Sequence, residues 1–521
     1  MRLKRIQDDF RVTELLSDED DVLGPGDHTL HRVTKKGLTT FEAADVLARG
    51  AGVERDRIAY AGLKDKDGIT GQFMTVEGGR PYRHKEPQLT ITPIGSAKRA
   101  LTSDDVEGNA FEVVVRDLTG DDMRRLRINL AQVREHGLPN YFDDQRFGCL
   151  RHGQGFVVRD LLRGDFEAAL KALLTAPSPF GAEKVEAYKA GIARRWGDWG
   201  ELRSYCRDRR GSSVFAHLAE HPGDFAGALE RGIASREKTI HLFAYQSYLW
   251  NRALGLEVLR VVPEEDRVWL PGDAGPLPTW RTLSPEARAE LESFELPLLG
   301  PGVELGDRAR RHYEAVFRAE GFRMEDFLAL DLSGFRPLAE PRAIGMDPEF
   351  LRAAPSEPDE LHRKKQKMRV RFTLPRGRYA TLVLKRLLAP TEAGARRPRL
   401  WISRHELIWP EDDGTVPSRL ELEARRKAER EERERRERRG RRGDERRGPR
   451  REGSWGERRD RGERGERGER GGRDDDRPRR DDRRRPKRDD RRGGRDEHRG
   501  PKRQGRGPGS PWQERERKPS R

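Results

Sequence analysis

The last fifth of the chain cannot form a folded core, and this restricts every packed element to the first 420 residues. Residues 421–521 contain only five apolar side chains: Leu422, Ala424, Ala428, Trp455 and Trp512. So little apolar surface cannot offset the conformational entropy lost on folding. We therefore expect a globular body followed by a disordered, Arg-rich tail. Glu-to-Arg pairs spaced four residues apart allow at most a short charged helix over residues 418–439.

The same division locates the charge. The chain carries a formal net charge of +16, but residues 421–521 alone hold 41 Lys and Arg against 26 Asp and Glu. The first 420 residues hold 66 basic and 65 acidic residues. The net charge therefore says nothing about the function of the body. The excess of basic residues in the tail predicts that the tail can bind RNA non-specifically through phosphates.

Several classes of protein are excluded or disfavoured. Two cysteines, Cys149 and Cys206, cannot build a disulfide framework. No run of about 18 apolar residues could span a membrane, and the first ten residues lack the apolar stretch of a secretory signal. We therefore expect a cytoplasmic protein. The chain also lacks a P-loop, a C-x-x-C pair and a G-x-S-x-G elbow, so none of these motifs points to a nucleotide, a metal or a serine hydrolase.

The body has the pattern of a mixed α and β protein. Alternating apolar residues predict strands, and apolar residues at helical spacing predict helices. The strands are expected over residues 10–16, 28–35, 72–76, 111–115 and 368–374. The helices are expected over residues 41–48, capped by Thr40, and over 123–136, 160–174, 236–259 and 379–388. Residues 261–306 are rich in Pro and Gly and show weaker periodicity.

A charged turn over residues 61–70 (AGLKDKDGIT) is the first candidate site. Its carboxylates stand among Lys64 and Lys66, and nearby ammonium groups keep a carboxylate ionised. An ionised carboxylate in a pocket can act as a base or a nucleophile. Composition alone favours the alternative, an exposed turn with solvated charges.

Residues 137–148 (GLPNYFDDQRFG) are the second candidate site. Three aromatic residues alternate with Asn, Gln and Arg, a combination that can stack on bases and contact base edges or phosphates. The alternative is a junction between a helix and a loop, with the aromatic rings in the core.

Taken in order, the motifs of the body resemble those of the TruD family of tRNA pseudouridine synthases. The resemblance covers most of the first 390 residues. The matching segments are Asp9-Phe10-x-Val12-x-Glu14 with Lys4 upstream, Lys35-Lys36-Gly37-x-x-Thr40, Ala61-Gly62-Leu63-Lys64-Asp65-Lys66, Gly108-Asn109-Ala110-Phe111, Pro139-Asn140-Tyr141-Phe142-x-x-Gln145-Arg146-Phe147-Gly148, and Arg371-Phe372-x-Leu374-Pro375-x-Gly377-x-Tyr379-Ala380-Thr381. In the G-x-K-D signature of the family, the aspartate falls on Asp65 and not on Asp67.

The resemblance implies an α+β fold with a mixed, largely antiparallel sheet. A pseudouridine synthase catalytic domain would comprise residues 1–155 and 307–420. A family-specific inserted α/β domain would comprise residues 156–306, and the charged tail would follow from 421 to 521. The tRNA would lie in the cleft between the two domains.

The resemblance also implies the reaction and the residues that carry it. Uridine in a tRNA, typically at position 13, becomes pseudouridine without a cofactor. Asp65 would be the catalytic aspartate, and whether it attacks the sugar or the base, or removes a sugar proton, stays open. The remaining expected site residues are Phe142 stacking on the flipped uracil, Asn140 orienting the base or the aspartate, Lys4 pairing with Asp65, Arg146 as a phosphate or structural contact, and Phe10, Glu14 and Lys64 in support.

Two other functions fit parts of the sequence. One is a non-catalytic RNA-binding protein or chaperone that works through its Arg/Gly-rich tail. The other is a glycosidase acting on RNA, which the lack of a second matched acid makes less favourable, although Asp67 is only two residues from Asp65.

One feature departs from the family pattern. Asp143 and Asp144 place two acids beside Phe142, the expected stacking residue, and their negative charge would oppose an RNA contact there.

Overall fold

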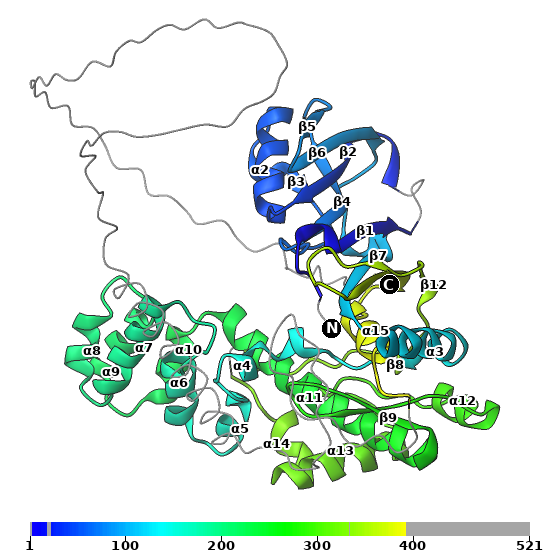
Figure 1. The fold of residues 1–521 in the computed structure, drawn as a ribbon. Coiled ribbons are helices and arrows are strands. Elements are labelled where there is room, and N and C mark those ends of the chain that lie inside the picture. The colour runs from blue at the N-terminus through cyan, green and yellow to red at the C-terminus, as the bar shows by residue number, and fades with distance from the viewer. Residues whose placement is uncertain (1–2, 18–21, 333, 392–521) are drawn as a thin grey trace, which may run out of the picture. The chain divides into compact units, whose positions relative to one another are not determined.

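The computed structural model describes residues 3–17, 22–332 and 334–391 (Figure 1). The charged tail, the helix expected over residues 418–439 and the last part of the expected body lie outside these residues. In the described part of the chain, no helix is both long and apolar enough to cross a membrane.

A ten-stranded mixed sheet forms the centre of one half of the molecule. Its strand order is β12-β14-β7-β1-β4-β2-β6-β5, with β13 paired to β14 and β3 paired to β4. Every neighbouring pair is antiparallel except β1 and β4. The strands are β1 (Phe10–Leu16), β2 (Leu23–Lys36), β3 (Ile58–Ala59), β4 (Ile69–Glu77), β5 (His84–Glu86), β6 (Leu89–Ala97), β7 (Val106–Leu118), β12 (Glu349–Ala353), β13 (Glu357–Pro358) and β14 (Gln366–Pro375). The expected mixed, largely antiparallel sheet is confirmed.

The one parallel pair decides where the functional segments meet. In β1 and β4, Arg11 is opposite Ile69 and Val12 is opposite Thr70. Since parallel neighbours start at the same edge of a sheet, the segments that precede the two strands converge there. Residues 3–9 and residues 60–68 are therefore brought together, although about 60 positions separate them in the sequence.

Helices cover the two halves of the sheet separately. The helix α2 (Thr40–Ala51) packs its apolar face against β2, β4 and β6. The helix α3 (Gly120–His136) packs against β7 and β12, and α15 (Ala380–Leu387) packs against α3. The cap of α2 is Thr39 and not Thr40 as expected. The Thr39 hydroxyl accepts a hydrogen bond from the amide of Glu42, whose carboxylate bonds back to the Thr39 amide. Thr40 is therefore free for another task.

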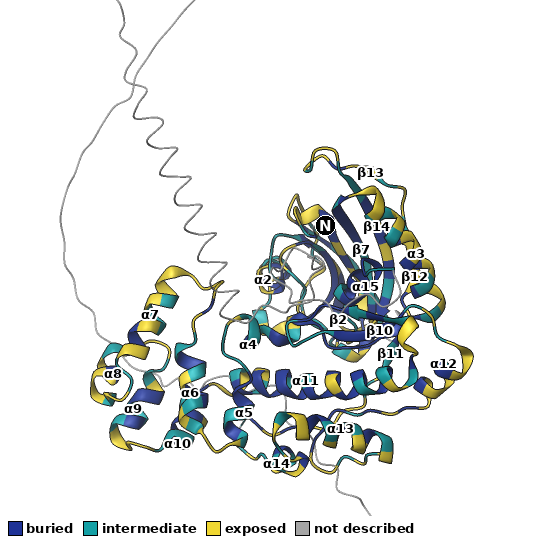
Figure 2. Cartoon of the chain, turned by 60° about the horizontal axis from the view of Figure 1, so that its bottom comes forward, coloured by how far each residue is buried: buried dark blue, intermediate teal, exposed yellow. Residues whose placement is uncertain are grey.

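The second half of the molecule is mainly helical and is organised around the long helix α11 (Ser235–Val261), one side of which is buried along most of its length (Figure 2). The other helices are α4 (Gly148–Arg151), α5 (Val157–Leu162), α6 (Phe166–Thr175), α7 (Glu183–Arg194), α8 (Trp199–Tyr205), α9 (Ser212–Glu220), α10 (Phe225–Gly232), α12 (Pro285–Glu292), α13 (Asp307–Glu320) and α14 (Met324–Leu328). Short 3-10 helices occur at η1 (Gln7–Asp9), η2 (Arg55–Arg57), η3 (Ser103–Asp105), η4 (Asp144–Phe147) and η5 (Glu264–Asp266).

The single helix expected over residues 160–174 is wrong. The chain instead forms α5 and α6, which are separated at Gly164. Gly164 has φ of +74°, a left-handed conformation that ends a helix and that side chains other than glycine adopt at a cost. Residues 261–306, which showed weak periodicity, contain the antiparallel pair β9 (Arg267–Leu270) and β10 (Leu277–Trp280) in addition to α12.

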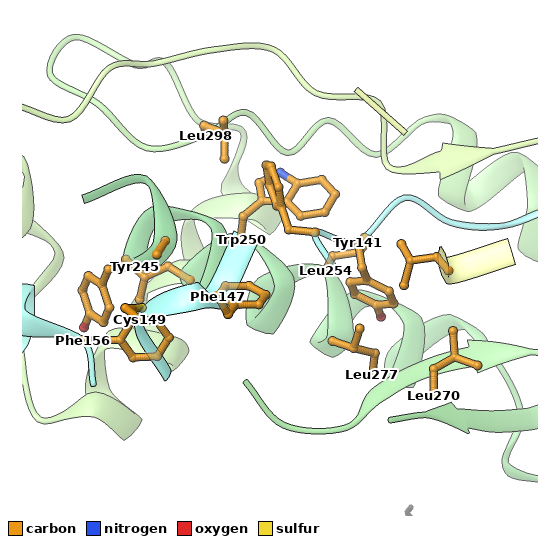
Figure 3. Packing of buried hydrophobic residues seen from close by; sticks show 14 of the residues in the cluster. Tyr141, Phe147, Cys149, Phe156, Tyr245, Trp250, Leu254, Leu270, Leu277 and Leu298 are labelled. Atoms are coloured by element: carbon orange, nitrogen blue, oxygen red, sulfur yellow. The ribbon is translucent and has the colours of Figure 1, made fainter. Parts of the chain in front are cut away.

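A short sheet connects distant parts of the chain beside α11. The strand β8 (Leu138–Pro139) pairs with β11 (Gly345–Met346). The segment that follows β8 packs into the largest apolar cluster of the described chain. In Figure 3 the rings of Tyr141, Phe147 and Trp250 lie within this cluster, with Leu254 and Leu277 beside Tyr141. The hydroxyl of Tyr141 donates to the carbonyl of Pro278 at 2.7 Å. The second candidate segment is thus firmly anchored to the helical half.

Candidate active site

An ion pair between Lys4 and Asp65 lies at the edge of the sheet where β1 and β4 begin. The Lys4 Nζ donates to Asp65 Oδ2 at 2.5 Å. The side chain of Asp65 is 33% exposed and that of Lys4 is 18% exposed, so the carboxylate can still be reached from outside. The Lys4 ammonium also lies 3.7 Å from the centroid of the Phe10 ring. It thus contacts both a carboxylate and an aromatic face.

The backbone of Lys4 is held in an unusual conformation. Its φ of +50° lies in the left-handed region, which costs a residue other than glycine roughly 1–2 kcal/mol. The Lys4 ammonium reaches Asp65 from this conformation. The surrounding structure therefore offsets local strain in order to place the ammonium on the carboxylate.

Lys35 fixes the backbone of the loop that carries Asp65. Its Nζ donates to the carbonyls of Leu38, Lys64 and Asp65 at 2.8, 3.2 and 2.9 Å. The residue is 1% exposed. Burial lowers the pKa of Lys35 to about 8, partly opposed by the carboxylates of Asp65 and Glu42. At neutral pH the group therefore remains mostly protonated and can supply all three donors.

The residue Thr40 provides a second anchor for the same loop. Its hydroxyl accepts a hydrogen bond from the Lys64 amide at 3.0 Å and donates to Gln72 Oε1 at 2.9 Å. Gly68 closes the loop against β1: a Cβ there would lie 2.7 Å from the carbonyl oxygen of Phe10. No other residue fits so close an approach. The amide of Asp67 donates to Asp65 Oδ1 at 3.0 Å, which fixes the second carboxylate oxygen.

The expected supporting residues Glu14 and Lys64 form a pair of their own. The Lys64 Nζ lies 2.7 Å from Glu14 Oε1 and donates to Asn109 Oδ1 at 2.9 Å. The other oxygen of Glu14 accepts from the amide of Phe73 at 2.9 Å. The pair links the Asp65 loop to β1, β4 and β7, so both residues hold the loop in place.

Asn140 lies in a second cluster, beside β8 and β11. It is fully buried, and its Nδ2 donates to the carbonyl of Ala343 at 2.8 Å. The guanidinium of Arg342 donates to both the carbonyl and the Oδ1 of Asn140, at 2.8 and 3.1 Å. The amide of Asn140 donates to the carbonyl of Ile344 at 2.7 Å. In this structure the polar groups of Asn140 are thus bonded to the segment that leads into β11.

Phe142 belongs to the same cluster and is only 4% exposed. Its amide and carbonyl both bond to the side chain of Asn251 on α11, at 2.8 Å each. Trp250 and Tyr379 contact the ring edge-to-face. The guanidinium of Arg342 lies over the ring, with Cζ 3.8 Å from the centroid. A cation therefore occupies the aromatic face that a base would use.

Arg146 approaches the same ring from a greater distance, with its Cζ 5.4 Å from the centroid of Phe142. Its Nε is buried and has no hydrogen-bond partner. The expected site residues are therefore brought together in two groups. Lys4, Asp65, Phe10, Glu14 and Lys64 form one group, and Asn140, Phe142 and Arg146 form the other.

The acids beside Phe142 do not face RNA, contrary to the expectation that they would oppose a contact. Lys385 of α15 donates to Asp143 Oδ1 at 2.5 Å and to Asp144 Oδ2 at 2.7 Å, and Thr381 donates to Asp143 as well. All three charged side chains are buried. Burial alone would lower the pKa of Lys385, but the two carboxylates raise it above its ordinary value. Both acids are thus neutralised within the protein.

The sequence did not identify four residues that organise these groups: Lys35, Thr40, Arg342 and Lys385. Lys35 and Thr40 belong to the Lys35-Lys36-Gly37-x-x-Thr40 motif, but their contacts with the Asp65 loop depend on the pairing of β2 with β4. Arg342 lies in a stretch without any recognisable pattern. In the described part of the chain, no group of three or more His, Cys, Asp and Glu side chains is placed to hold a metal ion.

Replacement of Lys35 by Met is expected to reduce kcat by about 10- to 100-fold, because Asp65 would be misplaced, while substrate binding changes little. The substitution leaves two loop carbonyls, those of Lys64 and Asp65, and the carbonyl of Leu38 without their donor. Each buried unsatisfied group costs roughly 1–3 kcal/mol. A displaced loop misplaces Asp65. Lys36→Met is the matched control, because the side chain of Lys36 pairs with the exposed Asp8 and no bond from it to the loop carbonyls is described. Equal kcat values for the two variants would contradict the positioning role of Lys35.

Comparisons with known proteins agree with one another. The family model described as "tRNA pseudouridine synthase D (TruD)" matches residues 1–387. A probable tRNA pseudouridine synthase D 1 from Methanococcus maripaludis is 30% identical over 74% of this chain and 99% of its own length. A probable tRNA pseudouridine synthase D from Methanopyrus kandleri is 34% identical over 70% and 86%. The tRNA pseudouridine synthase D from Aquifex aeolicus is 29% identical over 74% and 98%.

A solved structure shares the fold. The putative tRNA pseudouridine synthase D from Methanosarcina mazei superposes with a TM-score of 0.58, covering 74% of this chain and 93% of that chain at 23% identity. At this identity the solved structure shows that the two chains share a fold.

Proposed function

The chain belongs to the TruD family of tRNA pseudouridine synthases, and we propose that Asp65 is the catalytic group with which it converts uridine to pseudouridine in tRNA. One observation carries the choice of residue. Asp65 is a partly exposed carboxylate paired with Lys4 at 2.5 Å, on a loop that Lys35 and Thr40 fasten from behind. Such a constellation holds an ionised carboxylate at a defined place.

The reaction needs no redox partner and no net water. The N1–C1′ bond of the nucleotide breaks, the uracil turns, and C5 bonds to C1′ while the hydrogen on C5 leaves as a proton. Asp65 supports this exchange either by attacking the sugar or the base, or by removing a proton from the sugar. In all of these routes the carboxylate must be ionised at the start, and the ammonium of Lys4 favours that state.

For the substrate contacts we propose Phe142, Asn140 and Arg146. The target nucleotide has to leave its stack to reach Asp65, which costs a few kcal/mol. Stacking on an aromatic ring repays roughly 1–3 kcal/mol per base. If Phe142 is that ring, the guanidinium of Arg342 has to leave its face first, since it covers the ring at 3.8 Å. Asn140 would then orient the base or the carboxylate.

The finer features of the function are proposals as well. We place the target at uridine 13 of tRNA and the protein in the cytoplasm. We assign residues 1–155 and 307–420 to the catalytic domain and 156–306 to an insertion. At this boundary α13, the first helix after the insertion, packs against α11, which lies within it. Family membership disfavours a purely RNA-binding role. The tail, residues 421–521, is assigned an accessory role in gathering RNA through its basic groups.

Product analysis tests the proposed function. Purified protein would be incubated with unmodified tRNA, and the RNA digested to nucleosides. Pseudouridine is the expected product. Free uracil with abasic tRNA would identify an RNA glycosidase instead, and unchanged tRNA that remains bound to the protein would identify a binding protein.

Deletion of residues 421–521 is expected to weaken tRNA binding at low salt and to leave kcat unchanged at saturating tRNA. The tail carries 41 basic and 26 acidic residues, so its attraction for phosphates is electrostatic and is screened by salt. Affinity and turnover measured at low and high salt, with the full chain as control, would separate the two effects. Loss of turnover at saturation would make the tail part of the enzyme proper.

A further inference from the structure

Three arginines, Arg146, Arg342 and Arg378, lie at or near Phe142, and none of them forms an ion pair with any residue that the structure describes. The guanidinium groups of Arg146 and Arg342 lie over the Phe142 ring, with Cζ 5.4 and 3.8 Å from its centroid. Arg378 stands in the chain between Gly377, whose carbonyl accepts a hydrogen bond from Arg342, and Tyr379, whose ring contacts Phe142. In each arginine, the Nε is buried and has no hydrogen-bond partner. Each residue as a whole is half-buried, so part of it remains accessible.

The three cations lie close enough to affect one another. Burial is the main cause that lowers the pKa of Arg342 to about 10; the nearby guanidinium groups of Arg378 and Arg146 act in the same direction, and Tyr379 opposes them. Burial also lowers the pKa of Arg378. Like charges that are partly withdrawn from water and left unpaired destabilise the folded protein, unless an anion from outside compensates them.

The acids nearest in sequence cannot supply that compensation. Asp143 and Asp144 come directly after Phe142, but both are bonded to Lys385. Tyr379, the neighbour of Arg378, contacts the ring of Phe142 with its own ring. The arginines are therefore close to the expected base-stacking residue, and no described carboxylate pairs with their positive charge. An anionic ligand could do so.

We propose that Arg146, Arg342 and Arg378 form a binding site for a backbone phosphate of the RNA substrate, next to the nucleotide that Phe142 contacts. Guanidinium groups bind phosphate oxygens through paired, charge-assisted hydrogen bonds. The site is built from three distant segments: the 3-10 helix η4 after β8, the segment before β11, and the turn between β14 and α15. A phosphate there would fix the strand beside the flipped nucleotide. This inference takes RNA as the substrate and so rests on the proposed function.

The test uses Arg146→Gln and Arg378→Gln in the full-length protein. Arg342 is left unchanged, because its guanidinium also bonds to Asn140 and Gly377 and its loss would disturb the fold. Arg310→Gln is the control: Arg310 is an exposed arginine of α13 for which no side-chain bond is described, and the substitution removes the same charge. Binding of tRNA is measured over a series of salt concentrations.

Each of the two test variants should bind tRNA about 10-fold more weakly than the control, and the slope of log K against log salt should fall by about 1. Their Tm should equal that of the wild type or exceed it, because no ion pair is broken. Binding and salt slopes equal to those of Arg310→Gln would overturn the phosphate site, and so would weaker binding explained by a lower Tm. The readout does not depend on turnover. If the two variants bound tRNA more weakly and with a smaller salt slope, but the wild type made no pseudouridine, the proposed function would be refuted and the phosphate site would stand.

Discussion

Asp65→Asn is expected to abolish pseudouridine formation, lowering kcat by roughly 1,000-fold or more. Asparagine has nearly the same shape as aspartate but carries no charge, so it can neither act as a nucleophile nor accept a proton. It also loses the ion pair with Lys4, although the amide of Asp67 can still donate to its oxygen. Turnover would be measured with excess enzyme in a single-turnover assay, so that weak residual activity is not missed.

Asp67→Asn is the matched control for this variant. Asp67 lies two residues away on the same loop, and its side chain is exposed, while its backbone amide keeps the contact with Asp65. We expect Asp67→Asn to retain activity close to that of the wild type. Both variants should bind tRNA with similar affinity and unfold at similar temperatures. Substantial turnover by Asp65→Asn, or a comparable loss in Asp67→Asn, would remove Asp65 from the catalytic role.

Lys385→Met is expected to have the largest effect on stability, lowering the free energy of unfolding by about 3–5 kcal/mol. Removal of the lysine leaves the carboxylates of Asp143 and Asp144 buried without their ammonium partner. Since both acids follow Phe142 directly, the substitution should also loosen the proposed stacking loop and weaken tRNA binding. Unfolding by urea would measure the loss, with Lys184→Met, an exposed lysine of α7, as the control.

The pH dependence of Lys385→Met identifies the cause. Burial raises the pKa of Asp144 to about 6 even with Lys385 present, and removal of the lysine takes away an attraction that opposes this rise. When the pKa of a carboxyl is higher in the folded state than in the unfolded state, the folded protein loses stability as the pH rises toward that higher pKa. The loss of unfolding free energy caused by Lys385→Met should therefore be smaller at pH 5 than at pH 7.5. Combining Lys385→Met with Asp143→Asn and Asp144→Asn should recover part of the stability. If the loss of stability were independent of pH and were not recovered by the two Asn substitutions, its cause would be a packing defect and not the unpaired carboxylates.

Sequence patterns predicted the regular elements well where apolar periodicity was strong. The strands around Val12, Gln72 and Val370 and the helices around Leu47 and Leu130 are present. The mixed sheet, which is also present, was implied by the family resemblance and not by periodicity. The pattern failed at boundaries that depend on one residue's backbone, as at Gly164, or on a choice between adjacent residues with equal capping ability, as at Thr39 and Thr40.

The arrangement of the candidate site was harder to predict, for a physical reason. Motifs give residues, but the contacts among them depend on strand pairing across the whole sheet. The parallel pairing of β1 with β4 brings Lys4 to Asp65, and the pairing of β2 with β4 brings Lys35 beneath the same loop. Asp143 and Asp144 appeared to disfavour RNA because their partner, Lys385, is about 240 residues away in the sequence.

Release of the hydrogen on uracil C5 measures the central claim most directly. When C5 bonds to C1′, that hydrogen must leave, whereas hydrolysis or simple binding leaves it in place. Transfer RNA transcribed with uridine that carries tritium at C5 would be incubated with the full-length protein and with Asp65→Asn. We predict tritium release by the wild type that stops near one equivalent per tRNA, and none above background by Asp65→Asn. Equal release by both proteins, or no release by the wild type from tRNA that it binds, would contradict the account.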